Sequence, residues 1–158
     1  MLKKFILLIF ISVGLTGCGY SPMNSNMNTT NFMITKFEIK GDNQMNNLIE
    51  RKIEKYLNND SKNKYIIKVT TNLNKSPVAK DSTGKTTHIK IVGFLELNSK
   101  LEIQEDNELK KISFNESLTI KKHENNYEQR NYENIIIKNL ADLLFDKLVF
   151  YLSKNTLF

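Results

Sequence analysis

The stretch THIKIVGFLELNSKLEI, residues 87–103, decides the fold because apolar residues recur at every second position. Strict alternation with a period of two is typical of a strand that buries one face and leaves the other in solvent. The buried face is predicted to consist of Ile89, Ile91, Gly93, Leu95, Leu97, Ser99, Leu101 and Ile103. The stretch therefore predicts one long strand beside a hydrophobic core.

Three further strands are predicted around this one. Residues 105–108 have turn chemistry, and residues 109–121 alternate again, which predicts a long antiparallel hairpin. Upstream, residues 32–40 predict a strand whose buried face is Met33, Thr35, Phe37 and Ile39, and residues 64–74 predict another. Residues 75–85 contain Ser-Pro and Asp-Ser-Thr-Gly, and this composition predicts a loop.

Two amphipathic helices complete the pattern. Residues 43–59 have apolar residues at three- and four-residue spacing, with Asp42 or Asn43 placed to cap the start. Residues 131–153 carry a broader apolar face, which includes Leu140, Leu143 and Leu144. The predicted class is α+β, in the order β-α-β-β-β-α, with two helices packed on one four-stranded, mostly antiparallel sheet.

Composition disfavours several classes of function. The 158 residues contain 23 Lys and Arg, 17 Asp and Glu, 21 Asn, two His and one Cys. A lone Cys with His88 and His123 far apart disfavours a metal site, and no nucleophile or phosphate-loop motif is complete. The lysines are dispersed rather than clustered with aromatic residues, which disfavours nucleic-acid binding. The sequence thus predicts a protein that is not an enzyme and needs no cofactor.

The N-terminus resembles a bacterial lipoprotein signal. Two lysines precede an apolar run that is too short to span a membrane, and Leu15-Thr16-Gly17-Cys18 resembles a lipobox. That resemblance implies cleavage before Cys18, a diacylglycerol and an N-acyl chain on Cys18, and, with Gly19 following, an outer-membrane location facing the periplasm. The predicted organisation is a signal peptide at 1–17, a lipidated flexible linker at 18–31 and one domain at 32–158.

The order of these features resembles the LPS-assembly lipoprotein LptE family, especially its alphaproteobacterial members. The residues that carry the resemblance are the lipobox with Cys18 to Pro22, the strand 34–39, the helix with residues 48–53, the strand 65–69, the segment 76–84, the long hairpin and the segment 126–133 before the last helix. The resemblance implies an outer-membrane lipoprotein that plugs and helps assemble the LptD β-barrel. It also implies direct binding of lipopolysaccharide for insertion into the outer leaflet.

The residues that would bind lipopolysaccharide are predicted from chemistry alone. Lys75, Lys80 and Lys85 all fall in the predicted loop, where exposed ammonium groups are suited to lipid A phosphates. Two other classes remain open: an auxiliary lipoprotein of an ABC-type envelope lipid transporter, and another surface-binding lipoprotein. The lysines serve equally well as solubilising charge.

Overall fold

The computed structural model describes residues 31–57, 61–102 and 109–155. Its elements are, in chain order, β1 (Phe32–Gly41), α2 (Asn43–Ile53), the 3₁₀ turn η1 (Glu54–Tyr56), β2 (Asn63–Lys80), β3 (Thr86–Leu101), β4 (Lys110–Lys121) and α3 (Asn126–Lys154). The predicted element order and the α+β class are confirmed.

The four strands form one sheet in the spatial order β1-β2-β3-β4. β1 runs parallel to β2, because α2 and η1 carry the chain back across the sheet between them. β2 with β3 and β3 with β4 pair antiparallel, so the predicted mostly antiparallel sheet is also confirmed. The long hairpin is real: β3 pairs with β4 from His88↔Lys121 to Ser99↔Lys110.

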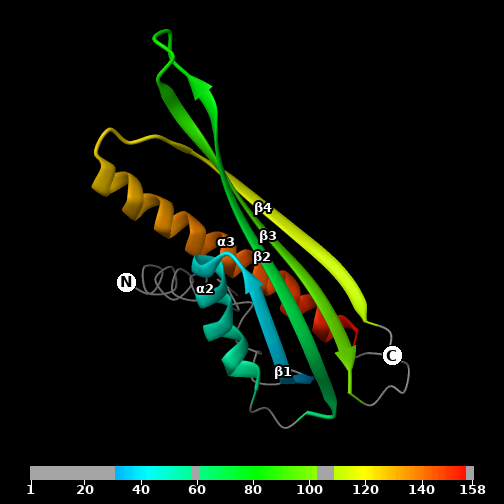
Figure 1. The fold of residues 1–158 in the computed structure, drawn as a ribbon. Helices are drawn as coiled ribbons and strands as arrows, with labels where there is room; N and C mark the ends of the chain where they lie inside the picture. Colours follow the sequence, from blue (N-terminus) through cyan, green and yellow to red (C-terminus); the bar gives the residue numbers. More distant parts are fainter. Residues whose placement is uncertain (1–30, 58–60, 103–108, 156–158) are drawn as a thin grey trace, which may run out of the picture.

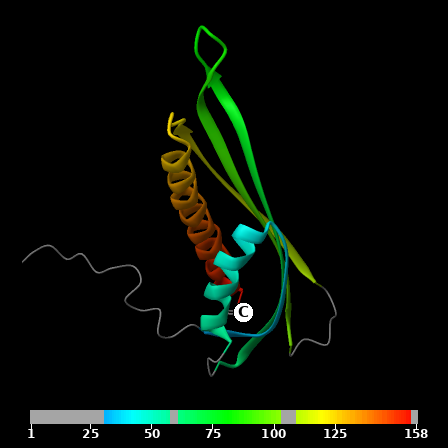
Figure 2. The same cartoon turned by 60° about the vertical axis from the view of Figure 1, so that its left-hand side comes forward.

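Both helices pack on one side of the sheet, so its two faces differ (Figures 1 and 2). We call the side under α2 and α3 the covered face; it contains Ile67, Val69, Ile91, Leu95 and Leu97, each no more than 1% exposed. We call the other side the open face. It is formed by residues 36, 38 and 40 of β1, the even residues 66–74 of β2, the even residues 90–100 of β3, and the odd residues 111–121 of β4.

The prediction for the first strand was wrong at its start. Phe32 and Ile34 are fully buried there, whereas Met33 is only partly buried. A bulge between Ile34 and Lys36 inserts one extra residue relative to β2, so the buried side changes from even to odd numbers. Phe37 and Ile39, as predicted, lie against the core.

The ends of both helices also differ from the prediction. α3 begins at Asn126 rather than 131, because the Asn125 side chain accepts hydrogen bonds from the backbone N–H of Tyr127 (2.8 Å) and Glu128 (3.4 Å). Leu143, predicted on its apolar face, is 47% exposed. α2 ends at Ile53 and continues as η1 to Tyr56; residues 58–60, where its end was predicted, lie outside the described part of the chain.

The predicted loop at 75–85 is mostly strand. β2 continues to Lys80 and β3 begins at Thr86, so a β2–β3 hairpin arm projects past the helices (Figure 1). β1 stops at Gly41↔Thr71, which leaves that side of β2 without a neighbouring strand. Pro77 is tolerated on such an edge because its missing N–H breaks no ladder bond, and the register shifts just after it.

Candidate functional site

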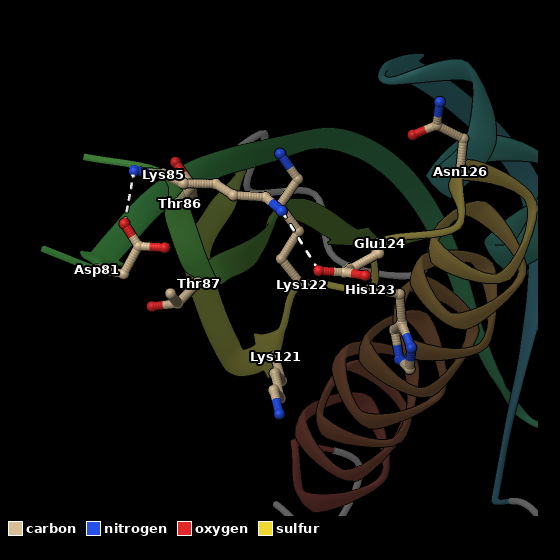
Figure 3. Close-up of a pocket in the computed structure, with 9 residues that line it drawn as sticks. All are labelled: Asp81, Lys85, Thr86, Thr87, Lys121, Lys122, His123, Glu124 and Asn126. Atoms are coloured by element: carbon tan, nitrogen blue, oxygen red, sulfur yellow. Dashed lines mark hydrogen bonds and ion pairs between the residues drawn. The ribbon is translucent and has the colours of Figure 1, made fainter. Parts of the chain in front are cut away.

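A half-open pocket lies between the end of the hairpin arm and the connection from β4 to α3 (Figure 3). Its volume is about 370 Å³. The residues that line it come from the arm and from this connection: Asp81, Lys85, Thr86, Thr87, Lys121, Lys122, His123, Glu124 and Asn126. The pocket is thus built from segments forty residues apart along the chain, which the β3–β4 pairing brings together.

The arm side of the pocket is shaped by Asp81. One of its carboxylate oxygens accepts hydrogen bonds from the Thr83 hydroxyl (2.6 Å), the Thr83 backbone N–H (2.9 Å) and the Lys85 backbone N–H (3.0 Å). The hydrogen bond from the Thr83 hydroxyl is the main cause that lowers the pKa of Asp81. Gly84 has a φ of +83°, a conformation that glycine adopts without strain. This network fixes the turn that presents Lys85.

The pocket has a surplus of ammonium groups. Lys85 Nζ lies 3.4 Å from Glu124 Oε1, and both side chains are exposed. Lys121 and Lys122 form no ion pair with another described residue. Three lysines and two carboxylates line the pocket, and compact ammonium groups of this kind bind phosphate oxygens as point charges. The arrangement is therefore suited to a small anionic group.

The first turns of α3 position the pocket residue His123. The His123 backbone N–H donates to Gln129 Oε1 at 2.7 Å, and the His123 ring packs edge-on against Tyr132 with 5.3 Å between ring centres. The His123 side chain is 42% exposed, and its Nδ1 is 4.0 Å from a Glu128 oxygen. His88 lies beside Thr87, 3.1 Å from its hydroxyl.

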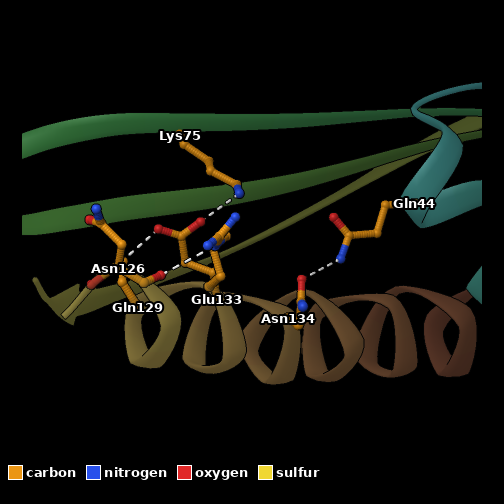
Figure 4. A network of polar contacts seen from close by, with 7 residues as sticks. Gln44, Lys75, Asn126, Gln129, Glu133 and Asn134 are labelled. Atoms are coloured by element: carbon orange, nitrogen blue, oxygen red, sulfur yellow. Dashed lines mark hydrogen bonds and ion pairs between the residues drawn. The ribbon is translucent and has the colours of Figure 1, made fainter. Parts of the chain in front are cut away.

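Lys75 forms a contact that the sequence did not predict (Figure 4). Its ammonium lies 2.6 Å from Glu133 Oε2, on α3, and Gln129 Nε2 donates to the other Glu133 oxygen at 2.6 Å. Burial raises the pKa of Glu133, but hydrogen bonds from Lys75 and Gln129 outweigh it and leave that pKa below its ordinary value. Lys75 therefore joins the base of the arm to α3.

The three predicted lysines do not lie together on one loop. Lys75 points from β2 to α3, Lys80 is exposed at the end of β2, and only Lys85 lines the pocket. The prediction was wrong about the loop because it assigned Ser-Pro to a turn, whereas Pro77 lies on a strand edge. Lys121 and Lys122 were missed, although a Lys-Lys-His run at the end of the 109–121 strand was a usable signal.

The predicted lipidation site and the expectations about membrane spans and metal sites remain to be compared with the structure. Cys18 and residues 1–30 are outside the described residues. Within the described ranges, no helix is long and apolar enough to span a membrane. In the same ranges, no cluster of three or more His, Cys, Asp or Glu side chains has a geometry that could hold a metal ion.

Comparison with known proteins relates the chain to others by fold. No protein-family profile matches the sequence, and no curated protein is similar to it in sequence. The crystal structure of rare lipoprotein B from Shewanella oneidensis is similar with a TM-score of 0.58 at 8% identity, covering 76% of this chain and 95% of that one. A minor lipoprotein from Acinetobacter baumannii is similar with a TM-score of 0.54 at 8% identity, covering 80% and 93%. The chain therefore has the fold seen in these bacterial lipoproteins.

Proposed function

We propose that this protein is a lipoprotein of the outer membrane, anchored through Cys18, that plugs an LptD-type β-barrel, supports its assembly and binds lipopolysaccharide. The observation that carries the proposal is the coincidence of two independent features. The fold of rare lipoprotein B is similar to this domain over nearly the whole length of the domain, and a segment that resembles a lipobox and ends in Cys18 precedes it. Two or more acyl chains on one cysteine anchor a protein stably.

The surface of the domain supports the barrel part of the proposal. The lumen of a large outer-membrane barrel is polar, so a plug needs hydrogen-bonding groups on its outside. The open face presents Asn, Ser, Thr and Lys side chains over all four strands. The apolar residues of the sheet lie mainly on the covered face, under the helices.

The pocket supports the lipopolysaccharide part. Lys85, Lys121 and Lys122 all line one half-open cavity, and Lys80 lies close by in sequence at the end of β2. Each phosphate contact of this kind is a charge-assisted hydrogen bond that contributes about 1.5–3 kcal/mol. Lys75 contributes less to this site, because Glu133 already neutralises its charge.

The deciding experiment places photo-crosslinkers at Lys90, Glu96 and Lys110 in cells. Each position should capture one large barrel protein, and depletion of the lipoprotein should lower the amount of correctly assembled barrel. Palmitate labelling should disappear in Cys18→Ser. Small soluble partners at all three positions, or normal barrel levels on depletion, would refute the plug.

Binding of lipopolysaccharide is tested separately. The triple variant Lys85→Glu, Lys121→Glu and Lys122→Glu should lose affinity for lipopolysaccharide, whereas Lys55→Glu with Lys138→Glu and Lys154→Glu on the helical layer is the control with the same change in charge. Equal affinity of wild type and the pocket variant would place the lipid site elsewhere. Adding Lys75→Glu and Lys80→Glu singly separates the remaining predicted residues.

A further inference from the structure

Charge is distributed unequally between the two layers of the molecule. The helical layer, comprising α2, η1 and α3, is nearly balanced, with seven basic side chains against six acidic ones. The open face is not balanced. It carries seven lysines, which are Lys36, Lys40, Lys68, Lys90, Lys100, Lys111 and Lys121, and two glutamates, Glu38 and Glu96. Much of the positive charge of the described chain therefore lies on the surface that no helix covers.

The two glutamates show how carboxylates fit among these lysines. Glu38 lies between Lys40 at 2.6 Å and Lys68 at 3.3 Å, so it joins β1 to β2. Glu96 lies 3.0 Å from Lys111 and joins β3 to β4. The hydrogen bond from Lys40 is the main cause that lowers the pKa of Glu38, and that from Lys111 lowers the pKa of Glu96. Carboxylates on this face therefore form ion pairs with lysines of the neighbouring strand.

Three other lysines of the face, Lys36, Lys90 and Lys121, form no ion pair with a described residue. Both Lys36 and Lys90 are exposed. Lys36 is on the edge strand β1, and Lys90 is on β3 where the arm leaves the body of the sheet. Lys36 and Lys90 thus lie toward opposite ends of the open face, and a partner that neutralises both must extend along it.

The side chains between the lysines favour a protein surface over a lipid one. Most are short and polar, such as Thr70, Asn72 and Asn115, and can form directional hydrogen bonds at the fixed spacing of the strands. Membrane-surface segments instead insert large apolar side chains into the headgroup layer. The apolar side chains of the open face, Ile66, Val92 and Phe94, are only partly exposed.

We infer that the open face docks against a protein surface rich in Asp and Glu side chains. The carboxylates of that surface pair with the lysines that Glu38 and Glu96 do not reach. The inference rests on the proposed function, under which that surface lines the lumen of the barrel. Complementary charge of this kind fixes register and accelerates association more than it adds affinity. It makes docking sensitive to salt, because exposed charges are screened over about 8 Å at physiological ionic strength.

The test compares two double variants with the same change in net charge. Lys36→Glu with Lys90→Glu alters the open face and leaves every pocket lysine in place; Lys55→Glu with Lys138→Glu alters the helical layer. The lipidated full-length proteins are purified from membranes, and the recovered barrel is quantified at low and high salt. We expect about tenfold less barrel with the open-face variant and less salt dependence. The helical variant should match wild type.

Two further probes decide between partners. A poly-glutamate column should retain wild type and the helical variant but not the open-face variant, and phosphatidylglycerol vesicles should not discriminate between the variants. The inference is overturned if the two doubles behave alike on the barrel and the column, or if only vesicle binding depends on the open face. If wild type recovers no barrel, the proposed function fails, and the column alone decides whether the open face binds carboxylates.

Discussion

Alternate residues of β3 face two different environments. On the covered face Ile91, Leu95 and Leu97 are fully buried, whereas on the open face Lys90 and Glu96 meet solvent. Burying one such aliphatic side chain contributes about 1.5–3 kcal/mol, while exposed charges contribute little to stability. Residues on one face of the strand therefore supply most of its stability, whereas residues on the other face can change with little effect on stability.

The largest expected effect comes from opening the covered face. Leu95→Ala removes a fully buried side chain and leaves a cavity in the core, so it should lower the free energy of unfolding by about 2–5 kcal/mol. Asn98→Ala, on the open face of the same strand, should change it by no more than about 0.5 kcal/mol. Urea unfolding followed by circular dichroism measures both. Comparable losses would contradict the division of labour between the faces.

Overfilling the covered face should have the next largest effect. A Cβ placed on Gly93 would lie 3.1 Å from Leu144 Cδ1 and 3.5 Å from both Leu140 Cβ and Met45 Cε. The larger Gly93→Val should therefore push α3 outward and cost about 1–3 kcal/mol. Thermal unfolding measures the cost, and Leu144→Ala should cost less in the Gly93→Val background than in the wild type. A stabilised single variant would show unfilled space under α3.

A smaller effect is expected where α2 is fixed onto the covered face. Asp42 caps this helix by accepting a hydrogen bond from the Met45 backbone N–H at 2.9 Å. Asp42→Ala leaves that donor unsatisfied and should cost about 1 kcal/mol, whereas Asp42→Asn keeps an acceptor and should cost less. Chemical denaturation distinguishes the two. Equal costs for Ala and Asn would mean that the cap contributes nothing.

The smallest effect depends on pH and concerns the contact between the arm and α3. The pKa of Glu133 is lowered in the folded state, so its contribution is complete above its unfolded pKa, about 4.3, and is lost as pH falls through the folded value. Glu133→Gln should therefore be less stable at pH 7 and flatter in its acid dependence. Lys75→Gln should also flatten it. Denaturation midpoints between pH 7 and pH 3 measure this, and unchanged acid slopes would contradict it.

Periodicity predicted the layers well because the alternation of apolar and polar residues within one strand shows which of its faces is buried. The alternation around Leu95 and Leu97 identified the covered face of β3, and the spacing around Leu140 and Leu144 identified the side of α3 that packs on it. The bulge after Ile34 escaped prediction, since it arises from pairing with β2 and not from β1 alone. The arm escaped for a related reason: Pro77 is compatible with a strand only on an edge, and edges are defined by neighbouring strands.

Some residues of the pocket could also be predicted from local sequence, and others could not. Lys85 was predicted as an exposed cation of the segment 75–85, which is a local feature. Lys121 and Lys122 were not, because their proximity to Lys85 depends on the pairing of β3 with β4. The ion pair of Lys75 was not predicted, since its partner Glu133 lies fifty-eight residues away.

By itself the sequence determined the α+β class, the element order and the covered face of the strands after β1, because these follow from local spacing and chemistry. Only the tertiary structure decided which charges remain unpaired. Lysines that are scattered along the chain gather on the open face because side-by-side strands place residues of distant segments within a few ångströms. Charge on a surface is a property of the folded sheet, and no single segment of the chain carries it.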